Sequence, residues 1–334
     1  MSGVIPSTLR RVDQPPPAEA PGNPVQAPSA GPSGTPPATS PAGSAAGGFA
    51  GEFAADLGAP LADPLDLAGL RAALLTPAGP VARLDVVART GSTNADLLAA
   101  ARAGAPDRSV LVAELQQAGR GRLDRRWLSP PGDGLTVSVL LRPSGVPPTR
   151  LSWLPLLAGV SLLRTVTEHT GLAAALKWPN DLLLGPPGGA PVAKCAGLLA
   201  EADAGGAEPA VVIGIGLNVR NRRTELPEGA SSLHAEGAEV RRNELLVALL
   251  RQLLADEAAW RAAGGDAEAV GLLAAYRAGC ATLGRPVRIE QPGGRSLLAT
   301  ALDVDGDGRL LVRDEAGATR AVAAGDVVHL RPIP

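Results

Sequence analysis

Two lysines are prominent among the residues that could do chemistry. The chain has 334 residues and 31 lysines and arginines, of which only Lys177 and Lys194 are lysines. Since arginine serves as the general cation here, a retained lysine indicates a position that needs a compact ammonium group rather than a planar guanidinium. On composition alone, chance retention is an equal alternative.

An arginine–glycine loop is the second candidate. Residues 116–122, with the sequence QQAGRGR, follow a predicted strand and precede Trp127. Guanidinium groups bind carboxylates and phosphates through paired hydrogen bonds, and glycines let the chain bend around a ligand. The segment predicts a loop that stays mobile, with its arginines unpaired, until an anionic ligand arrives. A solvated surface loop or an RNA-binding arginine–glycine patch is the alternative.

Residues 177–181, KWPND, form the third candidate. A predicted strand ends near Lys177, and Pro179 then favours a turn that presents Asn180 and Asp181. A lysine, an amide and a carboxylate at one strand end suit an anion and a metal-bound phosphate. The alternative is a buried Trp178 with polar residues at the rim of a turn.

Two further predicted strands contain glycines in unusual places. Gly197 lies inside residues 194–201 (KCAGLLAE), and Gly214 and Gly216 precede Asn218 in GIGLN. Glycine inside a strand indicates close approach of a ligand or of another backbone. Taken alone, either motif is better explained by tight sheet packing.

Taken together and in this order, these motifs resemble those of biotin–protein ligases. The resemblance runs from about residue 83 to residue 331 and includes the ordered set Ser92-Thr93-Asn94, Gln116, Gly119-Arg120-Gly121-Arg122, Trp127, KWPND, KCAGLLAE and GIGLN. It is closest to the short monofunctional form, because no counterpart of the DNA-binding domain is evident. Asp124 departs from the family, which often has glycine there.

The resemblance implies a two-step reaction. Biotin and ATP would form biotinyl-5′-AMP, and biotin would then pass to a specific lysine of a biotin carboxyl carrier protein. Mg²⁺ would arrive on the ATP phosphates, with no protein side chain expected as its ligand. A lipoate or octanoate ligase or transferase of the same fold is the nearest alternative, and an RNA-binding module is a more distant one.

The resemblance also implies roles for individual residues. Lys177 would bridge the biotin carboxylate and the α-phosphate, Arg120 and Arg122 would close over the adenylate, and Lys194 would have a smaller role at the strand rim. The biotin site would comprise Ser92, Thr93, Asn94, Gln116, Arg120, Gly121, Arg122 and Lys177. The ATP site would comprise Arg120, Arg122, Trp127, Lys177, Asn180 and Asn218.

The elements that would position these residues follow from apolar patterning and turn signals. Helices are predicted over residues 65–75, 93–103, 151–170, 243–262 and 267–278, with Thr93 as an N-cap and Asp96 three residues on. Strands are predicted over residues 84–88, 110–114, 135–141, 175–178, 193–201 and 210–219. Five short runs at 287–290, 296–303, 310–313, 320–323 and 327–330 predict a small barrel.

With the resemblance, this order predicts an α+β fold, in which helices flank a mixed β-sheet like that of class II aminoacyl-tRNA synthetases and biotin synthetases. A small C-terminal SH3-like β-barrel would follow. The expected domains are a disordered tail over residues 1–60, a biotin- and ATP-binding catalytic domain over 61–280 and the SH3-like domain over 281–334. The tail is rich in proline, alanine and glycine, so burial could not offset the cost of ordering it.

Composition excludes several function classes. A net charge of −2 and an aromatic content of 2% argue against a surface that binds nucleic acid, and DNA is not an expected partner. No apolar run suggests a membrane span or a secretory signal, so a cytoplasmic location is expected. The chain has two cysteines, too few for a disulfide framework, and three histidines, too scattered for a catalytic triad.

Overall fold

The computed structural model describes residues 61–122, 125–186, 188–203, 209–290, 296–323 and 326–329, together with Arg10–Arg11, Leu57 and Gly205. Most of the predicted tail and Asp124 lie outside these residues. Within the tail, Arg10–Arg11 form a short strand, β1, that the sequence analysis did not predict.

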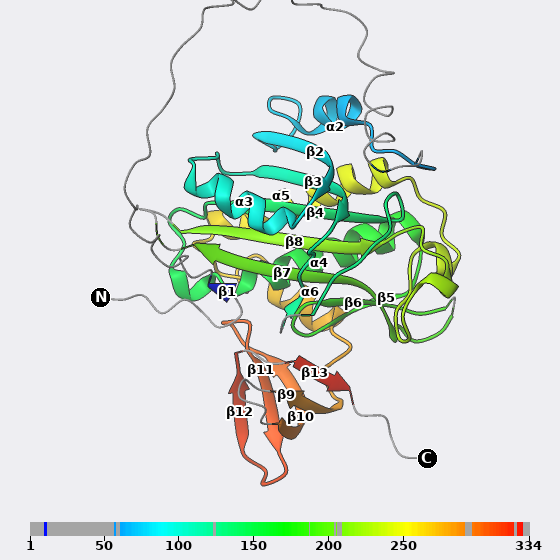
Figure 1. Cartoon of the computed structure of the whole chain (residues 1–334). Helices are drawn as coiled ribbons and strands as arrows, with labels where there is room; N and C mark the ends of the chain where they lie inside the picture. The colour runs from blue at the N-terminus through cyan, green and yellow to red at the C-terminus, as the bar shows by residue number, and fades with distance from the viewer. Residues whose placement is uncertain are drawn as a thin grey trace, which may run out of the picture.

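A mixed β-sheet forms the centre of the larger domain, in the order β2-β3-β4-β8-β7-β6-β5 (Figure 1). β2 and β3 are parallel, and the other neighbours in this order are antiparallel. β1 pairs in parallel with β7 at Glu201 and Ala202. The strands are β2 (Arg83–Thr90), β3 (Ser109–Gln116), β4 (Gly134–Leu141), β5 (Ala174–Lys177), β6 (Asp181–Leu184), β7 (Ala193–Asp203) and β8 (Ala210–Asn218).

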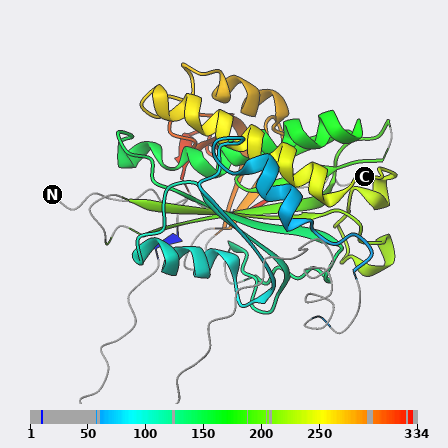
Figure 2. The same cartoon turned by 90° about the horizontal axis from the view of Figure 1, so that it is seen from above.

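Helices cover both faces of this sheet, as Figure 2 shows. α3 (Thr93–Arg102) lies on one face, while α2 (Leu67–Leu74), α4 (Trp153–Thr170), α5 (Arg242–Ala262) and α6 (Leu272–Gly279) lie on the other. Short 3₁₀ helices occur at Pro148–Arg150, Arg223–Glu225 and His234–Glu236. None of the helices in the described part of the chain is long and apolar enough to cross a bilayer.

Leucine, valine and alanine build most of the core, because the chain has few aromatic side chains. α4 is buried along most of its length, since it lies between the sheet and α5. Trp153, Trp178 and Trp260 are each at most 1% exposed and supply the largest buried side chains.

The start of α3 differs from the prediction. Ser92, not Thr93, is the N-cap: its backbone is extended (φ −159°, ψ 121°), and its Oγ accepts a hydrogen bond from the Ala95 amide at 3.5 Å. Asp96 instead accepts a hydrogen bond from the Thr90 hydroxyl. The correct cap places Thr93 and Asn94 in the first helical turn, at the carboxyl end of β2.

The five predicted C-terminal strands are all present and form a separate antiparallel sheet in the order β12-β11-β10-β9-β13. They are β9 (Pro286–Glu290), β10 (Ser296–Val304), β11 (Leu310–Asp314), β12 (Thr319–Val322) and β13 (Asp326–His329). The turn between β10 and β11 contacts the larger domain. Trp153 Nε1 donates to the Gly306 carbonyl at 2.6 Å, and Trp178 Nε1 donates to the Gly308 carbonyl at 3.1 Å.

Candidate active site

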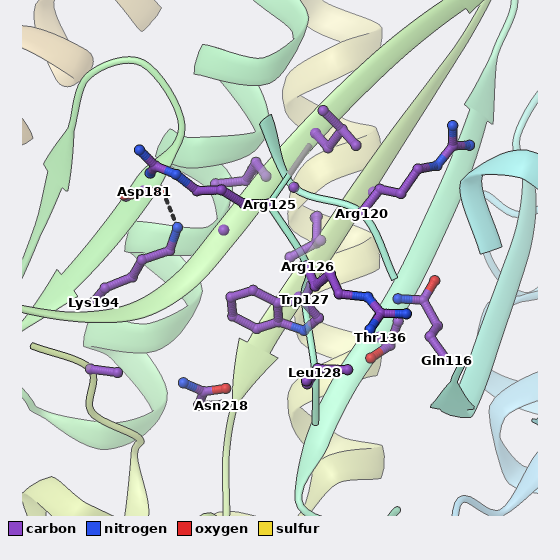
Figure 3. Close-up of a pocket in the computed structure, with 18 of the residues that line it drawn as sticks. Gln116, Arg120, Arg125, Arg126, Trp127, Leu128, Thr136, Asp181, Lys194 and Asn218 are labelled. Atoms are coloured by element: carbon purple, nitrogen blue, oxygen red, sulfur yellow. Dashed lines mark ion pairs between the residues drawn. The ribbon is translucent and has the colours of Figure 1, made fainter. Parts of the chain in front are cut away.

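A cavity of about 940 Å³ opens on the face of the sheet that carries α3. Its walls come from the start of α3, the end of β3, the arginine–glycine loop, the start of β6, the middle of β7 and β8, and the segment 224–230. Figure 3 shows side chains from these elements converging around Trp127. Segments far apart in the sequence therefore meet at one cavity.

The cavity brings together every predicted site residue except one. Its lining includes Ser92, Thr93, Asn94, Gln116, Arg120, Gly121, Arg122, Trp127, Asn180 and Asn218. Lys177, predicted as the bridging cation, does not belong to the lining, whereas Lys194 does. Lys194 of β7 therefore joins Lys177 of β5 as a candidate for the cation of this cavity.

An irregularity in the pairing of β6 with β7 explains why Lys194 reaches the cavity. Leu182 pairs with Ala196 but Leu183 pairs with Lys194, so β7 has one extra residue, Cys195, at this point. Such a bulge changes which face later side chains occupy, and it brings Lys194 to the same face as Gly197. Strict alternation would have placed these two residues on opposite faces.

Lys194 has two neighbours in the cavity. Its Nζ lies 2.7 Å from Asp181 Oδ1 and 5.9 Å from the centroid of the Trp127 ring (Figure 3). The side chains of Lys194 and Asp181 are 36% and 15% exposed, so the ion pair faces the cavity without being sealed from solvent. A ligand anion can therefore approach the ammonium group from the cavity.

Glycines in β7 and β8 make room for Trp127. Gly197 and Gly216 are register partners. A Cβ atom on Gly216 would lie 2.3 Å from the Trp127 ring, and one on Gly197 would lie 3.5 Å from it. The close approach that these strand glycines predict is therefore made, in this structure, by the indole of Trp127.

A hydrogen-bonded group lines the other end of the cavity. Gln116 Oε1 accepts from the Thr93 amide at 2.8 Å and lies 3.0 Å from Thr93 Oγ1. Ser138 Oγ lies 2.7 Å from Thr93 Oγ1 and 2.6 Å from Asn94 Oδ1. Ser138 could not be expected from the sequence, because a single serine inside an apolar strand is not part of any recognisable motif.

The arginine–glycine loop folds back on itself. Arg120 and Arg126 form a backbone bridge, and the Gly121 amide donates to the Arg125 carbonyl at 2.6 Å. Arg120 Nη1 lies 3.6 Å from Glu201 Oε1. The prediction that the loop arginines lack a protein partner is therefore wrong for Arg120.

Several buried polar atoms at this cavity have no hydrogen-bond partner within the described chain. Trp127 Nε1 and Asn221 Oδ1 are two of them. Because nearly all buried polar groups in folded proteins are paired, such atoms at one cavity indicate a polar ligand. The described residues contain no cluster of three or more histidine, cysteine, aspartate or glutamate side chains that could hold a metal ion.

Cys195 does not supply a nucleophile. Burial raises the pKa of its thiol, and the charge of Glu236 raises it further. The thiolate is the reactive form, so a buried thiol with a raised pKa is inert at neutral pH. The chemistry of the cavity therefore depends on cations and hydrogen bonds.

Comparison with known proteins agrees with this geometry. Residues 86–218 match the biotin/lipoate A/B protein ligase family, and residues 282–330 match the biotin protein ligase C-terminal domain. The chain is 44% identical over 273 residues to a biotin–[acetyl-CoA-carboxylase] ligase of Mycobacterium tuberculosis, covering 80% of this chain and 97% of that protein. The bifunctional ligase/repressor BirA of Escherichia coli is 33% identical, over 53% of each chain.

A solved structure shares the fold. The biotin protein ligase of Aquifex aeolicus in complex with biotin and ATP matches with a TM-score of 0.61 and 27% identity, over 75% of this chain and 99% of that one. The fold expected from the sequence is confirmed by this match and by the match of the C-terminal domain. By its sequence, its two sheets and its cavity, this chain belongs to the biotin protein ligase family.

Proposed function

We propose that this chain forms biotinyl-5′-AMP from biotin and ATP and transfers biotin to a lysine of a biotin carboxyl carrier domain. The observation that carries the proposal is the division of one cavity into two chemical ends. Lys194 and Asp181 lie on one side of Trp127, while Gln116 and Thr136 lie on the other (Figure 3). A ligand with a polar ring at one end and an acyl phosphate further along matches that division.

The end that carries Gln116 suits the ureido ring of biotin. Ser92 Oγ accepts the Ala95 amide, which leaves its own hydrogen to donate to a ligand carbonyl. Gln116 Oε1 is occupied by Thr93, so the amide of Gln116 presents Nε2 as a donor. The site can therefore satisfy both the carbonyl and the N–H groups of such a ring.

The cationic end suits adenylate formation. A carboxylate oxygen of biotin attacks the α-phosphorus of ATP, a P–O bond forms, and pyrophosphate leaves. Both reactants are anions, so cations must reduce their repulsion and stabilise the charge that develops. We assign that role to Lys194, with Arg120 and Arg122 closing over the intermediate. Mg²⁺ would enter with the phosphates of ATP.

The nucleotide would lie against Trp127, Asn180 and Asn218. The unpaired Trp127 Nε1 is a donor available to it. Asn180 and Asn218 are held in place, since their Nδ2 groups donate to the Leu198 and Ser231 carbonyls at 3.0 Å.

The second step needs no enzyme nucleophile. The amine of the carrier lysine attacks the acyl carbon of biotinyl-5′-AMP, an amide bond forms, and AMP leaves with the bonding pair. Positioning and charge neutralisation are sufficient for such a transfer. The carrier partner is a carboxylase domain, and we expect no DNA partner and a cytoplasmic location.

Exchange of labelled pyrophosphate into ATP tests the proposal directly. Addition of biotin should start the exchange, whereas lipoate and octanoate should not. Incubation with ATP, biotin and a carrier domain should then give biotinylation at one lysine. Exchange that depends on lipoate instead of biotin would overturn the assignment while leaving the family intact.

A further inference from the structure

Glu201 is a buried acidic side chain that contacts two residues of the cavity lining, Arg120 and Asn94, and that the proposed mechanism does not use. It lies on β7, and its side chain is 0% exposed. Burying a carboxylate is unfavourable unless hydrogen bonds and an opposite charge compensate. Its Oε1 has no hydrogen-bond donor in the described chain, and Arg120 Nη1 lies 3.6 Å away. Stability alone does not explain a carboxylate left partly unsatisfied here.

The other oxygen of Glu201 holds Asn94. Asn94 Nδ2 donates to Glu201 Oε2 at 2.9 Å and to the Leu199 carbonyl at 3.1 Å. Both amide hydrogens are thus used inside the protein, so Asn94 lines the cavity without a donor to offer a ligand. A Cβ atom on Gly214 would lie 2.3 Å from Asn94 Oδ1, so the glycine leaves the room that this amide occupies.

The orientation of Asn94 fixes the direction of the next hydrogen bonds. Asn94 Oδ1 bears no hydrogen, so the Ser138 hydroxyl at 2.6 Å must donate to it. Ser138 Oγ also lies 2.7 Å from Thr93 Oγ1. Thr93 Oγ1 has one hydrogen, which it can donate to Ser138 Oγ or to Gln116 Oε1 at 3.0 Å, and in either arrangement it keeps a lone pair for a ligand N–H.

We propose that Glu201 is a positioning residue for biotin, acting through the hydrogen-bond chain of Asn94, Ser138 and Thr93 and through Arg120. One oxygen of the Glu201 carboxylate orients the Asn94 amide. Through Asn94 and Ser138 it leaves Thr93 Oγ1 able to accept a hydrogen bond from the ureido ring. The other oxygen draws the Arg120 guanidinium toward the cavity. The inference rests on the biotin site proposed above and adds a residue that touches no substrate.

Steady-state kinetics of the full chain test the role. In Glu201→Gln the amide oxygen can still accept from Asn94, but the charge facing Arg120 is gone; we expect the biotin KM to rise about tenfold, because the Arg120 guanidinium loses the buried charge that holds it. The ATP KM should rise less than the biotin KM, because Arg120 serves both proposed ligands whereas the chain of hydrogen bonds serves only the ureido end. Asn94→Ala combined with Glu201→Gln should raise the biotin KM by less than the product of the single effects.

Glu257→Gln is the matched control. Glu257 is equally buried, at 0% exposure, and pairs with Arg108 and Arg261 away from the cavity. Its replacement should lower the thermal midpoint without changing the biotin KM. Ser138→Ala provides a second route that leaves the buried charge intact, and it should raise the biotin KM several-fold.

The outcomes separate this inference from the proposed function. If Glu201→Gln lowers the thermal midpoint but keeps a wild-type biotin KM, as Glu257→Gln should, then Glu201 is structural and the inference is wrong. If Ser138→Ala keeps a wild-type biotin KM, then the hydrogen bonds that run from Asn94 through Ser138 to Thr93 do not position biotin. Absence of biotin-dependent exchange in the unmodified protein would instead overturn the function itself.

Discussion

The ammonium group of Lys194 is the cation we assign to adenylate formation. Lys194→Arg should lower the rate of biotin-dependent pyrophosphate exchange by about 10²-fold, because removing a well-placed electrostatic group typically costs this much and a planar guanidinium does not fit a site built for a point charge. Lys177→Arg is the matched control, since the same change occurs outside the cavity lining. It should keep exchange within a few-fold of the wild type. The opposite order of effects would restore Lys177 as the bridging cation.

Gly216 is required by the position of Trp127. In Gly216→Ala the new methyl group would lie 2.3 Å from the indole, so Trp127 must move out of its slot or the strands must separate. We expect a rise of about tenfold in the ATP KM and a destabilisation of about 1 to 3 kcal/mol. Gly306→Ala is the control, because a Cβ atom there meets nothing within 4 Å. Unchanged ATP binding and stability in Gly216→Ala would remove Trp127 from the nucleotide site.

The thiol of Cys195 provides a chemical test that needs no substitution. Burial and the charge of Glu236 raise its pKa, so the unreactive protonated form persists through neutral pH and the thiolate appears only well above it. Incubation with iodoacetamide at pH 7.5 should leave Cys195 unmodified by mass spectrometry and exchange activity intact. Rapid alkylation with loss of activity would contradict this account of the strand.

At the scale of elements, contacts with the rest of the chain determine how mobile the arginine–glycine loop is. The loop is held by the bridge between Arg120 and Arg126 and by the ion pair with Glu201, while Arg125 and Arg126 are exposed. Trypsin should cleave after these two arginines in the free protein, and biotin with ATP should slow that cleavage by closing the loop over the adenylate. Biotin alone or ATP alone serves as the control. Equal cleavage under all conditions would show that the loop does not close on the intermediate.

Most elements could be predicted from apolar runs and turn signals, but the contacts that select the catalytic cation could not. β6 was missed because residues 181–184 are too short to separate from the turn before them. The bulge at Cys195 was missed because it arises from the pairing of two strands, and the sequence of neither strand contains a pattern that predicts it. The KWPND motif correctly indicated Asn180 and Asp181 at the cavity, yet its lysine lies outside the lining. The cavity lining is therefore a property of several strands together, which one motif cannot specify.

At the scale of the whole molecule, two indole hydrogen bonds are among the contacts between the C-terminal sheet and the larger domain. Trp178 lies in the turn that carries Asn180 and donates to Gly308. Trp178→Phe should therefore cost about 1 kcal/mol more than loss of indole volume alone, and it should raise the ATP KM by loosening that turn. Trp260→Phe is the matched control, because Trp260 is equally buried and its Nε1 has no hydrogen-bond partner within the described chain. Equal effects of the two substitutions on stability and on the ATP KM would show that this contact does not couple the domains.

A buried ion pair ties the segment before α2 to β3 and α5. Arg242 is 1% exposed and donates to both oxygens of Glu114 at 2.7 and 3.0 Å, and it also binds the Asp63 carbonyl through Nε at 3.1 Å. Its own backbone amide donates to the Asp63 carboxylate at 3.0 Å, while Leu65 packs in the core at 5% exposure. The segment just before α2 therefore completes the surroundings of a buried charge.

Two truncations test this boundary. A chain that begins at Leu57 keeps Asp63 and Leu65 but loses β1, and it should retain wild-type stability and exchange activity, because β1 contributes only two paired residues. A chain that begins at Asp66 keeps the N-cap of α2. It lacks Asp63, whose carbonyl and carboxylate both bind Arg242, and it lacks the core residue Leu65. We expect it to lose at least about 3 kcal/mol of unfolding free energy, since a buried guanidinium is left with fewer acceptors and apolar area is lost. Denaturant unfolding of both chains measures the difference. A similar loss of unfolding free energy in both chains would mean that the tail, through β1, is part of the folded domain. No loss in either chain would mean that the Arg242 ion pair does not need the segment before α2.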